Sequence, residues 1–130
     1  ALGFESGSDR ILASMEKGFC AREVRDASHR IAGAGITQMG FLLLGGPGET
    51  RQSVEESLAF VDSLPLDTVK VTCGVRIYPG TALARTAAER GLTEPGDDLL
   101  RPRFFVEPAI AEWLAGRMRA LVAERPHWVS

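Results

Sequence analysis

Apolar residues occur along the chain in two patterns. Some stand next to one another in short stretches, and others recur every three or four residues. Unbroken apolar runs of strand length are typical of parallel sheets, whereas the longer spacing predicts amphipathic helices. Strands are expected over residues 2–5, 36–44 and 69–78, of which 40–44 is almost purely apolar and 69–78 is rich in β-branched residues. Helical segments separate these runs, so the order of elements predicts an α/β chain with parallel strands.

The helical spacing predicts a short helix after Ser8 and longer helices over residues 21–32, 51–64 and 82–90. Ser8 and Thr50 are good helix caps, because their hydroxyls can accept a free backbone N–H. Pro108 is expected to open a last helix, within about residues 107–125. A short extended piece is expected over 103–106, and the tail 127–130 is given no role. The expected buried face of the last helix comprises Ile110, Trp113, Leu114, Leu121 and Val122.

The run over residues 40–50 stops abruptly at a glycine-rich turn and continues into a helix start. Its unbroken apolar part predicts a strand covered on both faces. Glycines let the backbone turn sharply and approach a bound molecule. Ligands of open α/β sheets and α/β barrels lie at the carboxyl ends of strands, so this turn is the first candidate for a binding edge. The alternative is a plain strand-to-helix connection, because Gly-Pro-Gly is common turn chemistry.

The expected strands end at Glu5, Leu44 and Tyr78, and this spacing suits the βα units of an α/β barrel. The expected fold is therefore a partial, half TIM-type barrel of about three parallel βα units plus a C-terminal helix. Three units cannot close a barrel. We expect residues 1–130 to form one piece of a longer chain.

The composition of the chain indicates which kinds of partner and site to expect. The chain is 45% hydrophobic and 25% charged with a net charge of −2, so nothing indicates a nucleic-acid or membrane partner. Cys20 and Cys73 are far apart and have no metal-ligand spacing, which favours a reducing, cytoplasmic location. We find no Ser/His/Asp arrangement and expect no metal site.

Polar residues at two strand ends are candidates for binding. Glu5 and Ser6 could hydrogen-bond sugar hydroxyls, although a turn carboxylate often binds only a neighbouring N–H. Arg76 lies in an apolar strand and should meet a carboxylate of the protein or a ligand, unless it faces solvent at an edge. Tyr78 could stack on a base or cap a pocket, or could be a simple rim aromatic.

Three segments, residues 3–9, 40–50 and 76–83, together resemble the second half of a radical S-adenosylmethionine (radical SAM) enzyme core. The resemblance is closest to the subfamily with Elp3-like and cobalamin-dependent members. It implies a partial six-unit βα barrel. In that family a 4Fe–4S cluster held by a three-cysteine loop reduces bound S-adenosylmethionine to a 5′-deoxyadenosyl radical.

The resemblance also implies site residues. Glu5 and Ser6 match the position that contacts the ribose and the methionine end of the cofactor. Residues 43–46 match the strand end that meets the adenine, and Arg76 and Tyr78 match the next strand end. The residues of this adenine-facing strand end are Leu43, Leu44, Gly45 and Gly46.

The three-cysteine loop of the family is absent from the sequence. We therefore expect the chain to hold no cluster, to provide no catalytic residue and not to be catalytic alone. The parent would use S-adenosylmethionine and a 4Fe–4S cluster, with cobalamin in a separate domain as an option. The parent reaction would be methylation, methylthiolation or another radical step.

An incomplete barrel should leave one inner face and two sheet edges open. We therefore expect the missing N-terminal half of the barrel as a partner, and self-association of the isolated chain as a dimer. A monomer covered by its C-terminal helix is the competing outcome. The rival function is a non-enzymatic α/β module that binds a nucleotide or a protein through its glycine turns.

Overall fold

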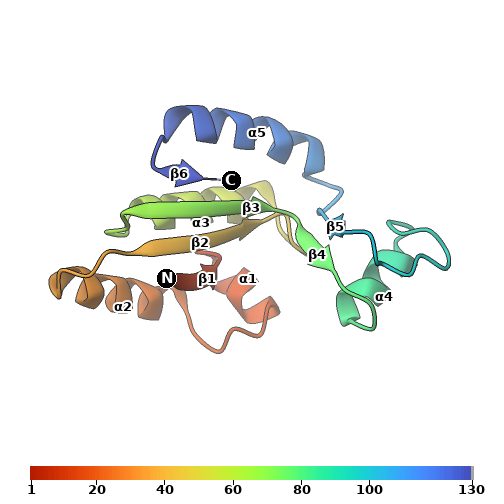
Figure 1. Ribbon diagram of the computed structural model, residues 1–130, viewed down its shortest axis with the longest axis horizontal. Helices are drawn as coiled ribbons and strands as arrows, with labels where there is room; N and C mark the ends of the chain where they lie inside the picture. Colours follow the sequence, from red (N-terminus) through yellow and green to blue (C-terminus); the bar gives the residue numbers. More distant parts are fainter. Residues whose placement is uncertain (130) are drawn as a thin grey trace.

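The computed structural model describes residues 1–129. Its main sheet has four strands in the order β1-β2-β3-β6, and every neighbouring pair is parallel (Figure 1). β2 and β3 pair without interruption from Met39 opposite Thr68 to Leu44 opposite Cys73. The α/β class and the parallel sheet expected from the sequence are confirmed. The strands are β1 (Leu2–Glu5), β2 (Met39–Leu44), β3 (Thr68–Cys73) and β6 (Trp128–Val129).

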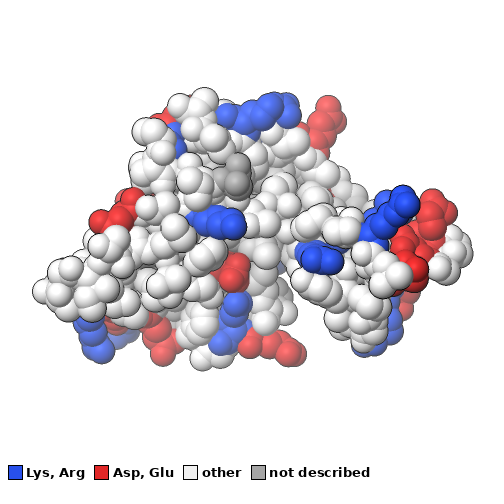
Figure 2. Space-filling model, viewed as in Figure 1, with Lys and Arg blue, Asp and Glu red and all other residues white. Residues whose placement is uncertain are grey.

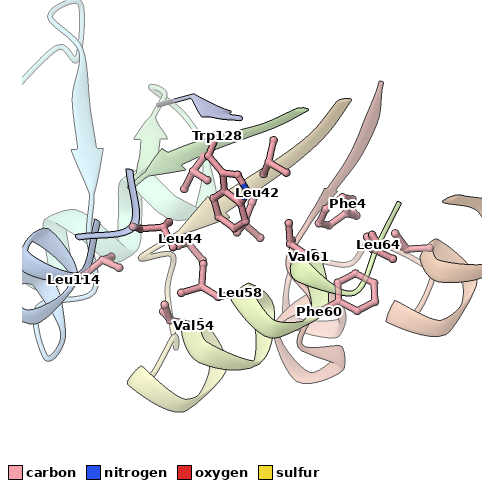
Figure 3. Close-up of a cluster of buried hydrophobic side chains, with 14 of the residues drawn as sticks. Phe4, Leu42, Leu44, Val54, Leu58, Phe60, Val61, Leu64, Leu114 and Trp128 are labelled. Carbon is pink, nitrogen blue, oxygen red and sulfur yellow. The ribbon is translucent and has the colours of Figure 1, made fainter. Parts of the chain in front are cut away.

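Helices connect these strands and pack against one face of the sheet. Val24 of α2 (Ala21–Gly33), Leu58 of α3 (Arg51–Asp62) and Leu114 of α5 (Ala111–Glu124) share one buried cluster with the strands. Figure 3 shows how Leu42 and Leu44 meet side chains of α3 in this cluster. A short helix, α1 (Asp9–Ser14), follows β1.

The opposite face of the sheet carries no helix layer of this kind within residues 1–129. Along β2, Gly40, Leu42 and Leu44 are buried, whereas Phe41 and Leu43 are only partly buried. The expectation that β2 is covered on both faces is therefore wrong for this chain. The alternation has a physical cause, since successive strand residues point to opposite faces and the helices cover only one. The helix-free face is called the open face below.

A glycine splits the strand that the sequence predicted over 69–78. Gly74 has a φ of +86°, and the chain leaves the sheet there to form β4 (Val75–Ile77). β4 pairs antiparallel with β5 (Arg103–Phe105), and α4 (Ala82–Glu89) lies between them in sequence. This lobe has its own small core of Ile77, Ala87 and Phe105, and projects beyond the carboxyl ends of β1–β3 (Figure 1).

Most helix boundaries agree with the sequence, and the differences lie near the C-terminal end of the chain. α5 begins at Ala111 rather than at Pro108, which lies in a turn before it. On its expected buried face, Trp113 is only partly buried and Val122 is exposed. The tail, to which no role was given, forms β6, and Trp128 is buried in the core. No helix in the described part of the chain is long and apolar enough to cross a membrane.

Candidate functional site

The turn after β2 depends on a glycine at position 45. Gly45 has a φ of +87°, a backbone conformation that side chains rarely adopt. A Cβ at this position would lie 2.9 Å from Leu114 Cδ2 and 3.2 Å from Val106 Cγ1. The Gly45 carbonyl accepts a hydrogen bond of 2.8 Å from the Glu107 N–H. Backbone geometry and close packing therefore both require glycine here.

Glu49 holds the same turn from within. Its side chain is 3% exposed, and its Oε2 accepts a hydrogen bond from the Gly45 N–H. Its Oε1 is buried and has no hydrogen-bond partner among residues 1–129. Burial raises the pKa of Glu49, against the opposing effects of the Gly45 and Gly46 N–H groups and the charge of Arg10. Sequence reasoning missed Glu49; its only signal was an acidic residue between the turn glycines and the helix cap.

Distant segments fix the outside of this turn. The Gly48 N–H donates to Glu107 Oε2 at 2.9 Å, and Arg10 donates to the Gly48 carbonyl at 3.0 Å. Arg90 forms an ion pair of 3.3 Å with Glu107. α3 then starts as expected, because the Thr50 hydroxyl accepts from the Ser53 N–H. The segments that carry Arg10 and Glu107 therefore both hold the turn after β2 in place.

Glu5 ends β1 in a strained conformation. Its φ is +70°, and the Ser6 N–H donates to the Phe4 carbonyl at 2.9 Å. This is a γ-turn with a positive central φ, the rarer and more strained kind. The Glu5 side chain is 27% exposed, and its Oε1 lies 3.9 Å from Lys17 Nζ. A non-glycine residue held in this region suggests a functional constraint, because the strain has to be offset by other contacts.

Ser6 has a structural role. It is fully buried, its Oγ lies 3.0 Å from Ser57 Oγ, and it accepts from the Ser8 N–H at 3.1 Å. The Ser57 hydroxyl also accepts from the Gly7 N–H. The expected cap Ser8 is the N-cap of α1 by position but makes no side-chain cap bond. Ser6 therefore fixes the loop after β1 to α3, and its hydroxyl is already engaged within the protein.

The adenine-facing residues expected from the sequence divide between the two faces. Leu44 is fully buried toward the helices, whereas Leu43 is partly buried and points to the other face. A Cβ on Gly46 would have Val75, Leu43 and Met15 as its nearest neighbours, at 3.4–3.9 Å. These side chains form a small apolar ledge around Gly46 at the carboxyl end of the sheet.

Arg76 and Tyr78 do not join this ledge. Both lie in or just after β4, in the separate lobe, and both are exposed. The Arg76 guanidinium carbon lies 4.8 Å from the centre of the Tyr78 ring, and Arg76 forms no ion pair within the described residues. Among residues 1–129 no carboxylate pairs with Arg76, and its side chain is exposed; a carboxylate supplied by a ligand stays a prediction.

The two cysteines occupy different environments. Cys20 is partly buried at the N-cap of α2, and Cys73 is exposed at the end of β3. Although the residue as a whole is exposed, partial desolvation of its thiol, with a contribution from the charge of Glu49, raises the pKa of Cys73 and so disfavours a reactive thiolate. Within residues 1–129, no three His, Cys, Asp or Glu side chains gather where they could hold a metal ion.

Comparison with known proteins finds relatives that match part of the chain. No protein-family model matches the chain. The chain is 34% identical over 90 residues to an uncharacterized methyltransferase of Pyrococcus horikoshii, a match that covers 69% of the chain and 19% of the relative. It is 30% identical over 69 residues to the tRNA-2-methylthio-N(6)-dimethylallyladenosine synthase of Bordetella petrii, covering 52% of the chain and 14% of that protein. The synthase of a Shewanella species is 32% identical over 68 residues.

These matches make the chain homologous, over half to two thirds of its length, to a methyltransferase and to tRNA methylthio synthases. Each match spans less than one fifth of the relative. Neither kind of relative points to the Elp3-like branch that the sequence resemblance suggested.

Proposed function

We propose that the chain forms part of the S-adenosylmethionine pocket in a radical SAM enzyme core, and that other parts of the parent protein hold the iron–sulfur cluster. Two kinds of support combine. The three segments that resemble this family occur in the family's order, and the relatives carry the names of a methyltransferase and of tRNA methylthio synthases. Methyl and methylthio transfer are two of the parent reactions that the resemblance implies.

The observation that carries the proposal is the strained γ-turn of Glu5 beside the β2 strand end. Glu5 pairs in register with Leu42, so β1 ends beside the strand whose continuation carries Gly46. A partly exposed carboxylate at one strand end and apolar side chains at the neighbouring strand end suit a ligand with sugar hydroxyls and a flat base. The strain at Glu5 is a local cost that a binding role would explain.

The residues present fit the cofactor in part. Glu5 would accept hydrogen bonds from the ribose, while Leu43 and Gly46 would contact the adenine through apolar and backbone atoms. Ser6, Leu44, Gly45 and the buried Glu49 would act indirectly, by keeping the strand ends in place. S-adenosylmethionine, when bound, would supply the reactive group of the parent enzyme.

The chain does not fit the iron–sulfur cluster. Its two cysteines are far apart in sequence, and no metal-binding group forms within the described residues. The role of its residues in the parent would be to bind and orient the cofactor and to exclude water from it.

The open face suggests where the rest of the parent would pack. β1 pairs on one side only, with β2, among the strands of residues 1–129, so its outer edge could accept a further parallel strand. The partly buried Phe41 and Leu43 on the open face would then become part of a barrel interior. Without that partner, two copies of the chain would join through the same edge or face.

Calorimetric titration of S-adenosylmethionine into the complete parent protein tests the proposal. Glu5→Gln removes one charge at the proposed ribose contact and should weaken binding about 5- to 50-fold, as expected for the loss of a charged hydrogen bond. Glu16→Gln is the matched control, since Glu16 is an exposed carboxylate that also has a positive φ, +55°. Equal affinities for both variants and the unchanged protein would contradict the role of Glu5.

A further inference from the structure

The lobe formed by β4, α4 and β5 presents a group of exposed aromatic and cationic side chains. Arg76 and Phe104 are directly opposite each other in the antiparallel pair, so both side chains lie on the same face of the hairpin. Tyr78 follows two residues after Arg76, and the Arg76 guanidinium lies over its ring at 4.8 Å. We call Arg76, Tyr78 and Phe104 the hairpin face.

The hairpin face is exposed although its opposite side is packed. Tyr78 and Phe104 are 53% and 54% exposed, whereas Ile77 and Phe105, on the α4 side, are almost fully buried. The lobe therefore has a core without the hairpin face and does not need these two rings for its own packing. Large exposed aromatic side chains that lie together indicate a binding surface.

The charge of the hairpin face favours an anionic, planar partner. Arg76 forms no ion pair within residues 1–129, in contrast to Arg90 and Arg103 of the same lobe. Figure 2 shows basic side chains on the visible side of this lobe and acidic ones toward its outer end. A guanidinium held over an aromatic ring can stack on a nucleobase and can also attract a phosphate.

The shape of the hairpin face favours an extended ligand, such as a single-stranded nucleic acid, over a small molecule. Small ligands usually bury most of their surface in a concave site. Half-exposed rings on a hairpin form a shallow platform instead, which is how aromatic side chains bind successive bases of single-stranded nucleic acids. The hairpin face also starts close to the turn after β2, because a Cβ on Gly45 would lie 3.6 Å from the Gly74 nitrogen and a Cβ on Gly74 would lie 3.3 Å from Phe104 Cβ.

We propose that the hairpin face binds single-stranded nucleic acid by stacking unpaired bases on Tyr78, Phe104 and the Arg76 guanidinium. The net charge of −2 gave no sign of such a partner, because it averages over the whole chain. Because the hairpin face has two exposed rings and one cation, stacking, rather than phosphate contacts, should supply most of the affinity. This inference is independent of the proposed S-adenosylmethionine pocket, which involves other residues.

Titration of the 15N-labelled chain with a short adenine oligonucleotide, followed by NMR, tests the proposal. Amide shifts are expected at residues 75–78 and 103–105. An abasic oligonucleotide of equal length keeps the phosphates and removes the bases, and it should bind at least about 5-fold more weakly. With one or two phosphate contacts, the affinity should fall only slightly with salt, with a logarithmic slope of about −0.7 to −1.4. RNA and DNA versions of the oligonucleotide show whether the 2′-hydroxyl matters for this binding.

Three variants and one control localise the binding. Tyr78→Ala and Phe104→Ala should each weaken it about 5- to 100-fold, because each removes one stacking surface. Arg76→Lys keeps the charge and loses the planar group, so it should also weaken binding. Leu100→Ala is the control: Leu100 belongs to the same lobe and is 79% exposed but cannot stack. Far-ultraviolet circular dichroism checks that all four variants remain folded.

Several results would overturn the proposal. These are no shifts with any oligonucleotide, shifts confined to the main sheet, equal binding of the abasic oligonucleotide, or equal loss in Leu100→Ala. Shifts of the hairpin face that depend on protein concentration alone would show that it contacts a second copy of the chain instead. A failed titration with S-adenosylmethionine would leave this result unaffected, because the two ligands are read from different amides.

Discussion

Replacement of Gly45 by alanine tests how the turn after β2 is held. The new side chain would have to adopt a φ of +87°, which costs about 1–2 kcal/mol for a residue with a Cβ. It would also lie 2.9 Å from Leu114 Cδ2, and Leu114 is fully buried in the core. Overpacking of this kind costs typically about 1–3 kcal/mol. Gly45→Ala should therefore lower the free energy of unfolding by about 2–5 kcal/mol in urea titrations.

Gly80→Ala is the matched control for backbone strain. Gly80 has a φ of +77°, but a Cβ there would meet no atom within 4 Å. Its cost should be about 1 kcal/mol, since the stiffer unfolded chain offsets part of the strain. A second test combines Gly45→Ala with Leu114→Val, which removes the Cδ2 atom; the added alanine should then cost less than in the unchanged background. Equal losses for Gly45→Ala and Gly80→Ala would refute the packing argument.

Four further measurements test other parts of the structure. Because burial raises the pKa of Glu49 above its ordinary 4.5, the folded state favours its protonated form, and this stabilisation is lost as the pH rises through the raised pKa. The stability of the unchanged protein relative to Glu49→Gln should thus fall as the pH rises above 4.5 in urea titrations, and a difference that does not change with pH would contradict this reasoning. Glu5→Gly should relieve the strain at φ +70° and raise the free energy of unfolding by about 0.5–1 kcal/mol; a loss would mean that Glu5 stabilises the fold. Sedimentation equilibrium should show dimers through the open face or the β1 edge, and one concentration-independent species near 14.0 kDa would rule them out. Anaerobic reconstitution should leave the isolated chain without stoichiometric iron, whereas about four irons per chain with cluster absorbance would disprove this.

The local elements that the sequence predicted well are those fixed by neighbouring residues. The run over 40–44 and its glycine turn, the cap at Thr50 and the helical spacing of α3 all agree with the structure. Each depends on strand or helix periodicity or on a cap three residues away, which the sequence displays directly.

The features that sequence analysis missed depend on contacts between distant segments. β-branched residues on both sides of Gly74 favoured one long strand, and only the pairing of β4 with β5 explains why the chain leaves the sheet there. Trp128 is buried because β6 pairs with β3, more than fifty residues earlier. A short tail carries no signal for such a partner.

The residues of the candidate site also fall into those that the sequence predicts and those that only the structure shows. The turn glycines and Glu5 could be found from their position at expected strand ends. The structural roles of Ser6 and Glu49 could not, because they depend on Ser57 and on burial beneath the turn. Arg76 and Tyr78 were placed at the end of a sheet strand, and the break at Gly74 moves them to another surface.

The most direct test of the proposed pocket is an NMR titration of the 15N-labelled chain with S-adenosylmethionine. Half a pocket should bind weakly, with a Kd on the order of 1–10 mM. We expect amide shifts at Glu5, Leu43 and Gly46, and none at the hairpin face. Shifts confined to other residues, or no shifts at all up to about 10 mM cofactor, would contradict the proposed pocket.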